Sequence, residues 1–430
     1  MNKSILNLAI PNIISNITVP MLGMVDLALM GHLGSPVYIG AIGLGSVIFN
    51  VLYLSLGFLR MGTTGFTAQA YGKNDKQEIA HGLYRPLLIA FSLALSLIIF
   101  QFPIEKISFF LLSGSDEVKT LAREYFYIRI FAAPATLGLM VLMGWFVGMQ
   151  NTRIPMFLSI FINMLNIGFN LFFVKMLGLD VDGVAWGTLL AQYGGLTFGL
   201  LLLARNFRKH LLPLQKQVLL NLVMLKRFFK VNRDILIRSI ALILTLSFFT
   251  SESADLGDSV LAINSMMLQY FFVFSYFMDG FAYAGEALVG KFTGRNDAEA
   301  IKKTIRYLLA WGVSLSLPFL LAYSIFYKQL ILLLTDSNDL IILSMTYKWW
   351  MIFIPITTFA AFIWDGIYIG ATASVAMRNT MLIASVCVFI PAWYFGLQHW
   401  SNHGLWLAFH LFMLSRGILM TLFAPKALNI

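Results

Sequence analysis

The sequence predicts an all-α polytopic membrane protein with twelve transmembrane helices, arranged in two six-helix lobes related by a parallel internal repeat. Three observations predict this class. Hydrophobic residues make up 59% of the 430 residues and charged residues only 12%. Apolar stretches recur along the chain, and short sequence signals repeat at one fixed distance. A soluble domain contains about 25% charged residues, so this composition is typical of a membrane protein.

Twelve apolar stretches are long enough for a helix that crosses a bilayer, which needs roughly 20 residues. They are residues 5–31, 38–61, 83–104, 124–148, 155–177, 184–204, 234–251, 259–289, 307–327, 342–370, 379–397 and 404–424. Little sequence remains between these stretches, which leaves no room for a soluble catalytic domain. We therefore expect a protein that is not an enzyme and uses no cofactor.

The distribution of basic residues predicts the orientation of the chain. The connection 205–233 contains eight Lys and Arg residues and no Asp or Glu, and the connections that follow the second and eighth spans are also basic. Basic loops remain on the cytoplasmic side, so both termini are expected to be cytoplasmic. The net charge of +10 therefore indicates membrane orientation and not a nucleic-acid partner. We expect a multi-pass protein of a bacterial-type inner membrane that functions as a monomer in the lipid bilayer.

The two halves of the chain share sequence signals at one offset. The sequence GKND at 72–75 recurs as GRND at 294–297, which is 222 residues later, and Gly148 and Gly370 have the same separation. The repeat predicts an N-terminal lobe at 1–204, a basic cytoplasmic linker at 205–233 and a C-terminal lobe at 234–430. Because six spans are an even number, both lobes have the same topology and the symmetry axis follows the membrane normal.

A single carboxylate, Asp26, lies inside the first apolar stretch. A charged group at the centre of a bilayer costs at least ~2.5–3.5 kcal/mol, and such groups are usually functional. Asp26 is a candidate for binding and releasing a proton, or for holding a Na+ ion; the alternative is a structural acid bonded to a neighbouring Asn. Pro11 and Pro20 permit kinks in the same helix, and Asn12 shares a face with Asp26.

Polar residues in the fifth and sixth spans are candidates for the N-terminal lobe's ion or substrate cavity. Asn163, Asn166 and Asn170 share one helix face because they are three and four residues apart. Thr188 and Gln192 in the next span are one turn apart and join the same hypothesis. Such residues either line a cavity with the carboxylate of the first span or connect helices through hydrogen bonds.

A second polar stripe is expected in the C-terminal lobe. Tyr276, Asp279, Tyr283 and Glu286 lie on one face of the eighth span. Asp365 in the tenth span is a further candidate, although it precedes a glycine and could instead cap or break its helix. No metal site is expected apart from the Na+ ion considered above.

Four sequence runs resemble those of the DinF branch of the MATE (multidrug and toxic compound extrusion) transporters. They are FLRMGTTGFTAQAYG at 58–72, GWFVGMQNTR at 144–153, NRDILIRS at 232–239 and DGFAYAGEA at 279–287. The resemblance implies twelve helices in two lobes and the export of small amphipathic, mostly cationic compounds in exchange for H+ or Na+.

The resemblance also assigns roles to residues of the N-terminal lobe. It implies that Asp26 is the coupling acid, that the first helix bends at Pro11, and that Asn166 and Thr188 surround the acid. The chain departs from the pattern at Asn170, where relatives commonly have an Asp. Because an Asn does not titrate, Asp26 is left without a second acid from the fifth span.

The function expected from the sequence is therefore a cation-coupled antiporter that works by alternating access. The alternative is a lipid-linked glycan flippase of the same broader superfamily, which would need a strongly cationic central cavity for pyrophosphate. A membrane-embedded enzyme would need a nucleophile–base pair or a metal cluster within the spans, and we find neither in the sequence. A scaffold without transport activity is disfavoured by the acidic stripes.

Overall fold

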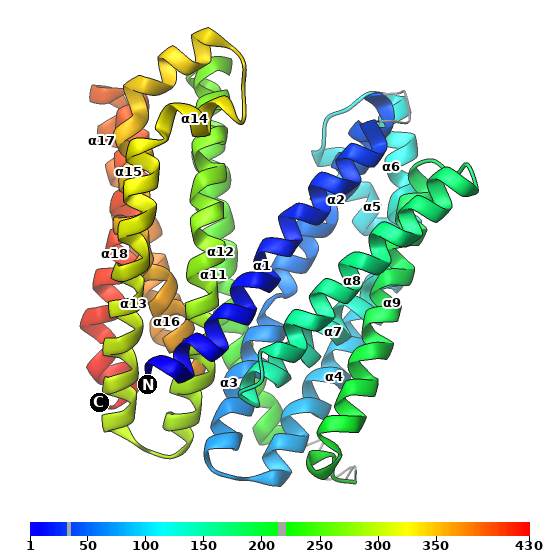
Figure 1. The fold of residues 1–430 in the computed structure, drawn as a ribbon, viewed down its shortest axis with the longest axis vertical. Helices are drawn as coiled ribbons and strands as arrows, with labels where there is room; N and C mark the ends of the chain where they lie inside the picture. Colours follow the sequence, from blue (N-terminus) through cyan, green and yellow to red (C-terminus); the bar gives the residue numbers. More distant parts are fainter. Residues whose placement is uncertain (32–35, 214–220) are drawn as a thin grey trace. The chain divides into compact units, whose positions relative to one another are not determined.

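The computed structural model describes the backbone of residues 1–31, 36–213 and 221–430, and the side chains of these residues except 19–31, 36 and 222. The described residues form two compact units (Figure 1). Unit 1 comprises Met1–Ile13 and Phe229–Ile430, and unit 2 comprises Ile14–Phe228. The chain thus passes between the units twice, within its first helix and again near Phe228.

The described elements are helical. In the first half they are α1 (Asn2–Gly31), α2 (Pro36–Leu56), α3 (Phe58–Gly72), α4 (Lys76–Ile99), α5 (Gln101–Leu111), α6 (Asp116–Arg129), η1 (Ile130–Ala132), α7 (Ala133–Gly148), α8 (Arg153–Leu171), η2 (Phe172–Met176), α9 (Val181–Asn206) and η3 (Arg208–His210). In the second half they are α11 (Leu222–Asp255), α12 (Asp258–Gly294), α13 (Ala298–Ile325), α14 (Tyr327–Leu332), α15 (Asn338–Gly370), α16 (Ser374–Ile383), η4 (Ala384–Phe389), α17 (Ile390–Trp400) and α18 (Asn402–Leu428).

Eleven helical segments of the described residues are long and apolar enough to cross a membrane. They begin with Val37–Gly72 and end with Asn402–Leu428, and each overlaps one of the apolar stretches expected from the second onward. The first expected span falls in α1, part of which lies outside the described side chains. The chain is therefore an all-helical membrane protein, and twelve spans remain a prediction.

Two helix starts illustrate how the repeated sequence signal shapes the backbone. Asn74 and Asn296 both adopt positive φ angles, 55° and 53°. Each precedes an aspartate that caps the next helix: Asp75 accepts hydrogen bonds from the amides of residues 77 and 78, and Asp297 accepts one from the amide of residue 300. An Asn tolerates the left-handed conformation and an Asp satisfies orphan amides, so the dipeptide ends one helix and begins the next.

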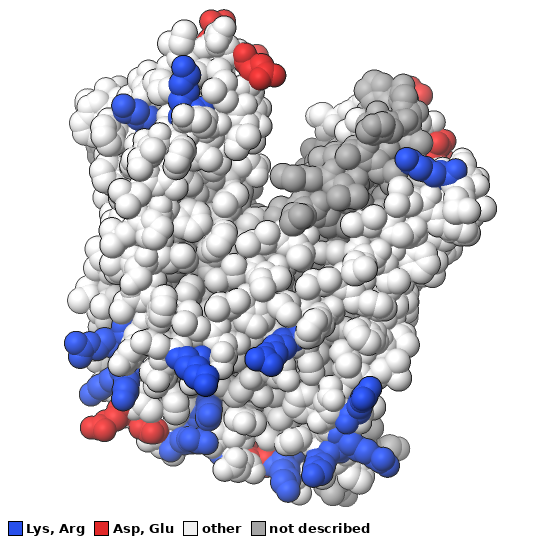
Figure 2. All heavy atoms as spheres, viewed as in Figure 1, with Lys and Arg blue, Asp and Glu red and all other residues white. Residues whose placement is uncertain are grey.

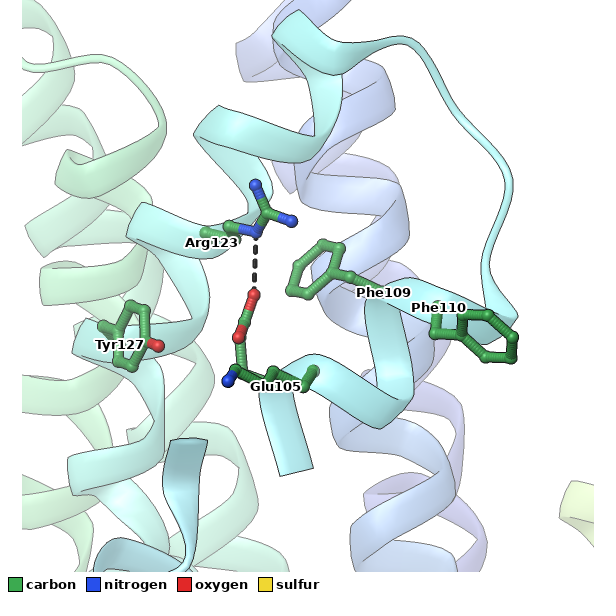
Figure 3. A pocket seen from close by; sticks show the side chains of 6 residues that line it. Glu105, Phe109, Phe110, Arg123 and Tyr127 are labelled. Carbon is green, nitrogen blue, oxygen red and sulfur yellow. Dashed lines mark hydrogen bonds and ion pairs between the residues drawn. The ribbon is translucent and has the colours of Figure 1, made fainter. Parts of the chain in front are cut away.

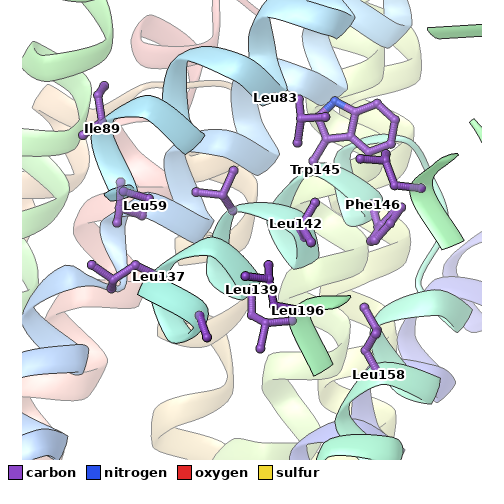
Figure 4. Close-up of a cluster of buried hydrophobic side chains, with 14 of the residues drawn as sticks. Leu59, Leu83, Ile89, Leu137, Leu139, Leu142, Trp145, Phe146, Leu158 and Leu196 are labelled. Carbon is purple, nitrogen blue, oxygen red and sulfur yellow. The ribbon is translucent and has the colours of Figure 1, made fainter. Parts of the chain in front are cut away.

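The core of unit 2 lies where α3, α4, α7, α8 and α9 meet, and Figure 4 shows part of it. Trp145 on α7 is fully buried, and its indole nitrogen donates to the carbonyl of Ile79 across 3.0 Å. Leu142 and Leu158 are also fully buried in this cluster. The large aromatic group is therefore fixed both by packing and by a satisfied polar atom.

Small residues bring helices into close contact at two places 222 residues apart. A Cβ atom added at Gly148 would lie 2.9 Å from the carbonyl oxygen of Thr64, which places α7 against α3. A Cβ atom added at Gly370 would lie 2.5 Å from the carbonyl oxygen of Glu286, which places α15 against α12. Both partners of the second contact are 222 residues beyond those of the first. Close backbone approach at small residues is a common way for membrane helices to associate.

Aromatic packing and a buried hydrogen bond connect helices of unit 1. The ring centroids of Phe249 and Trp406 are 5.0 Å apart, and Tyr368 donates its hydroxyl hydrogen to the carbonyl of Met420 across 2.7 Å. These contacts tie α18 to α11 and α15.

Candidate functional site

The expected coupling acid, Asp26, lies in α1, and its side chain is outside the described residues. The same helix includes Pro11 and Pro20 without an interruption of its helical assignment. Pro11 is buried, and the junction between the two compact units falls two residues later, after Ile13. Asn12 is 2% exposed and donates from Nδ2 to the carbonyl of Leu8 across 3.0 Å. The described α1 is continuous at its expected hinge.

Two hydrogen bonds join α1 to α8 within unit 2. The hydroxyl of Ser15 donates to that of Ser159 across 2.7 Å, and Nδ2 of Asn163 donates to the carbonyl of Thr18 across 3.1 Å. The numbering increases in the same direction on both helices, so α1 and α8 run parallel here. Asn163 therefore anchors the expected coupling helix to the helix that holds the Asn stripe.

Asn166, Asn170 and Thr188 form one hydrogen-bonded network between α8 and α9. Nδ2 of Asn170 donates to Oδ1 of Asn166 across 2.9 Å, and Nδ2 of Asn166 donates to Oγ1 of Thr188 across 3.0 Å. Thr188 in turn donates to the carbonyl of Val184 across 2.8 Å. Both Asn side chains are 1% exposed. The structure thus brings together three of the residues that the sequence proposes for the N-terminal lobe.

Helix packing explains why these side chains meet. A Cβ atom at Gly187 would lie 3.0 Å from the backbone nitrogen of Asn170, so the absence of a side chain lets α9 approach α8 at this level. Gln192 is half-buried and makes no hydrogen bond with the described residues. The network therefore connects helices through hydrogen bonds, which is one of the two roles that the sequence offers for these residues. Gln192 is not part of it.

The acidic stripe expected in the second half lies on one continuous helix, α12. Glu286 is 1% exposed, and Tyr276, Asp279 and Tyr283 are half-buried. None of the four is without an interaction partner. Because α12 is uninterrupted, the predicted spacing places all four on one helix face.

Asp365 neither caps nor breaks its helix, since α15 continues to Gly370. Its buried carboxylate accepts hydrogen bonds from Nη2 of Arg238 on α11 and from Nη2 of Arg416 on α18, the latter across 2.6 Å. Each of the three residues is less than one-tenth exposed. Asp365 is therefore the counter-charge of two buried arginines, and its carboxylate is engaged by both.

The sequence interpretation missed Arg238 and Arg416 as partners of Asp365. Both arginines lie within apolar stretches that were identified as membrane spans, where a buried cation needs a counter-charge. The need of a buried arginine for a counter-charge was therefore the signal in the sequence that pointed to an acidic partner. The sequence alone does not tell which helices face each other, so the partner of each arginine stayed unidentified.

Two further buried polar clusters in unit 1 were not anticipated. Asp234, which is fully buried, accepts from Nη1 of Arg378 across 2.6 Å and from the hydroxyl of Ser374 across 3.1 Å. Asn264 and Asn402 exchange hydrogen bonds of 2.7 and 3.0 Å between their side chains. These clusters connect α11 to α16 and α12 to α18, as expected for polar residues that join membrane helices.

A groove of about 520 Å3 opens in unit 2 beside α5 and α6, away from the predicted site residues (Figure 3). Its carboxylate, Glu105, is 7% exposed and accepts from Nε of Arg123 across 2.7 Å. The guanidinium also lies over the ring of Phe109, 5.4 Å from its centroid. The carboxylate of this groove is therefore already paired with Arg123. Within the described part of the chain, no group of three or more His, Cys, Asp or Glu residues could hold a metal ion.

The chain matches the MatE family over residues 11–172 and 235–394. It is 35% identical over 417 residues to DNA damage-inducible protein F of Escherichia coli K12, covering 97% of this chain and 90% of the relative. It is 24% identical over 351 residues to the probable multidrug resistance protein NorM of Photorhabdus laumondii, covering 80% of this chain and 76% of the relative.

Solved structures of low sequence identity share the fold. The Vibrio cholerae MATE transporter VcmN in the bent form superposes with a TM-score of 0.88 at 17% identity, covering 99% of this chain and 97% of the other. An outward-facing multidrug resistance MATE family transporter superposes with a TM-score of 0.85 at 19% identity, covering 99% and 96%. The family match and the 35% identical relative show that this chain is a membrane transporter of the MATE family, in its DinF branch.

Proposed function

We propose that this transporter is a cation-coupled antiporter that exports amphipathic, mostly cationic drugs or metabolites by alternating access, with Asp26 as the coupling residue. The observation that best supports this is the position of Asp26 on a helix anchored to the Asn stripe of α8. A carboxylate in such a span is costly to retain, so its presence favours a role in ion transport.

The contacts between α1 and α8 support a shared site. Thr18 pairs with Asn163, and Asp26 lies eight residues beyond Thr18, about 12 Å at 1.5 Å per residue. Asn170 lies seven residues beyond Asn163, about 10.5 Å along the parallel helix. If the register continues, Asp26 and Asn170 are at the same depth, where the carboxamides and Thr188 offer the polar groups that a proton or Na+ site needs.

The proposed cycle uses the charge of Asp26 to change the conformation of α1. Binding of H+ or Na+ neutralises the carboxylate in the outward-facing state, α1 bends at Pro11, and the cavity releases its substrate. The ion leaves on the cytoplasmic side, where the next substrate binds. A ligand shifts such an equilibrium only through its differential affinity for the two states. We propose that both termini are cytoplasmic and that the monomer is the functional unit.

A two-lobe architecture with twelve spans and a parallel repeat also belongs to this proposal. The paired caps at Asp75 and Asp297 support it, as does the close helix contact at Gly148 that recurs at Gly370. The proposed lobes are 1–204 and 234–430, joined by the basic linker 205–233. Gln192 and the stripe of α12 would then border the ion and substrate pathways of the two lobes.

The test is transport of a fluorescent cationic dye by the purified protein in proteoliposomes, with an imposed pH gradient and, separately, a Na+ gradient. Dye movement driven by either gradient is expected, and the gradient that drives it identifies the coupling ion. Dye distribution that follows neither gradient would contradict ion-coupled antiport.

A lipid-linked glycan flippase is the second candidate. The buried pair Arg238 and Arg416 is the observation in its favour, since a pyrophosphate needs cationic partners. Their shared contact with Asp365 argues against it, because the carboxylate already engages both guanidinium groups. Competition between a lipid-linked precursor and a cationic dye for the purified protein would distinguish the candidates.

A further inference from the structure

We propose that α13 binds an anionic phospholipid, with the phosphate held by Lys302, Lys303 and Arg306 and an acyl chain lying along the apolar face of the same helix. This site is separate from the residues of the proposed transport cycle. It rests on unpaired charge, on a groove and on the alignment of an apolar stripe within one helix.

The three cations lie within about one helical turn, and all are exposed. None of them makes an ion pair or a side-chain hydrogen bond with the described residues. They line a groove of about 640 Å3 together with Tyr307 and Ala310, and no carboxylate lines it. The small side chain of Ala310, one turn after Arg306, leaves room beside the cations for a bulky group.

Comparison with two other hollows of the described structure shows that this charge pattern is distinctive. In the groove of Figure 3, Arg123 is paired with Glu105. In a third hollow, of about 130 Å3, Arg85 is paired with Glu78 across 3.2 Å. Among these three hollows, the groove on α13 is the one lined by cations and by no carboxylate, so it suits an anion.

Residues on the C-terminal side of the cations favour a lipid as the source of that anion. α13 is a candidate membrane span from Ala298 to Ile325. Ala310, Val313, Leu317 and Leu321 are exposed on α13 at spacings of three and four residues, so they continue one face. The eleven helical steps from Ala310 to Leu321 extend about 16 Å, close to half of the ~30 Å hydrocarbon core. A cationic cluster followed by an apolar stripe of one-leaflet length matches the charged headgroup and the acyl chain of an anionic phospholipid.

Basic side chains gather on the surface around this groove, near the start of a membrane helix. Figure 2 shows Lys and Arg side chains over the lower part of α13 in that view. Long basic side chains near the end of a membrane helix reach the headgroup layer, where they attract anionic lipids. The opposite edge of α13 contacts the start of α1, since Trp311 donates to Oδ1 of Asn2 across 3.2 Å. A bound lipid would therefore stabilise α13, the helix that contacts the start of α1.

The test measures binding of phosphatidylglycerol to the purified full-length protein in uncharged detergent, by native mass spectrometry and by the shift in unfolding temperature. Phosphatidylcholine and inorganic phosphate are the comparison ligands. The binding variant combines Lys302→Gln, Lys303→Gln and Arg306→Gln. Its matched control combines Arg205→Gln, Arg208→Gln and Lys209→Gln, three exposed cations at the end of α9 and in η3.

We expect the binding variant to lose phosphatidylglycerol affinity by on the order of 100-fold, from three contacts of about tenfold or less each, while the matched control retains it. Ala310→Phe fills the groove without changing charge and is expected to weaken binding of this lipid at least severalfold. This second variant keeps the test decisive if the triple variant does not fold.

Three results would overturn the proposal. Equal loss in both triple variants would reduce it to unspecific charge attraction. Stabilisation by inorganic phosphate equal to that by phosphatidylglycerol would identify a free anion as the ligand. Unchanged lipid binding after Ala310→Phe would exclude the groove.

Discussion

Nη2 of Arg416 donates to the carboxylate of Asp365 across 2.6 Å, and both side chains are buried in unit 1. Arg238 approaches the same carboxylate oxygen from α11. One acid thus joins three helices, α11, α15 and α18. The acid that the sequence offered as a further polar candidate in the second half is engaged in a structural cluster.

Asp365→Asn is expected to destabilise the protein strongly, because it leaves two buried guanidinium groups without a counter-charge. Breaking a buried pair by removing one partner costs about 3–5 kcal/mol. Unfolding in mixed detergent micelles measures the change, and Asp336→Asn, at an exposed position, is the control. Full stability of Asp365→Asn together with a changed ion dependence of transport would instead assign the acid to coupling.

Asn166→Ala and Thr188→Val are expected to be coupled, because they remove the two partners of one hydrogen bond. Each single variant leaves a buried polar group with one partner fewer, at a cost of roughly 1–3 kcal/mol. The double variant should cost less than the sum by about 1 kcal/mol, as measured in a double-mutant cycle of unfolding free energies. Gln192→Ala, which removes no hydrogen bond within the described structure, should change stability by less than about 0.5 kcal/mol.

Gly187→Ala is expected to separate α9 from α8. The added methyl group would lie 3.0 Å from the backbone nitrogen of Asn170, and overpacking of this kind costs about 1–3 kcal/mol. Gly168→Ala, at an exposed helical position with open space around the added atom, should instead stabilise by about 0.5–1 kcal/mol. The unfolding temperatures of the two variants should therefore move in opposite directions. Movement in the same direction would contradict the close approach at Gly187.

The sequence was sufficient for the eleven candidate spans of the described residues and for the shared face of the Asn residues. Length and hydropathy identify spans, and the helical period fixes which residues lie on one face, so Asn166 and Asn170 were placed together correctly. Neither property tells which helices pack against each other. The pairing of Asp365 with Arg238 and Arg416 therefore needed the structure, as did the separation of Gln192 from its expected neighbours.

The junction inside α1 needed the structure for the same reason. Hydropathy treats 5–31 as one span, whereas residues 1–13 belong to the same compact unit as the second half of the chain. Those contacts depend on the faces of α12 and α13, such as Gly280, where an added Cβ atom would lie 2.9 Å from the carbonyl of Ala9. A single glycine on a distant helix is not recognisable in the sequence as a partner of α1.

The most direct test of the central claim is dye transport by Asp26→Asn in proteoliposomes, compared with the wild type and with Asp336→Asn under the same imposed ion gradient. Asparagine keeps the size of the side chain but neither titrates nor carries charge. We expect gradient-driven transport by Asp26→Asn to fall at least tenfold, with dye binding retained and Asp336→Asn behaving as the wild type. Gradient-driven transport at the wild-type rate in Asp26→Asn would contradict the claim that this carboxylate couples the ion to the substrate.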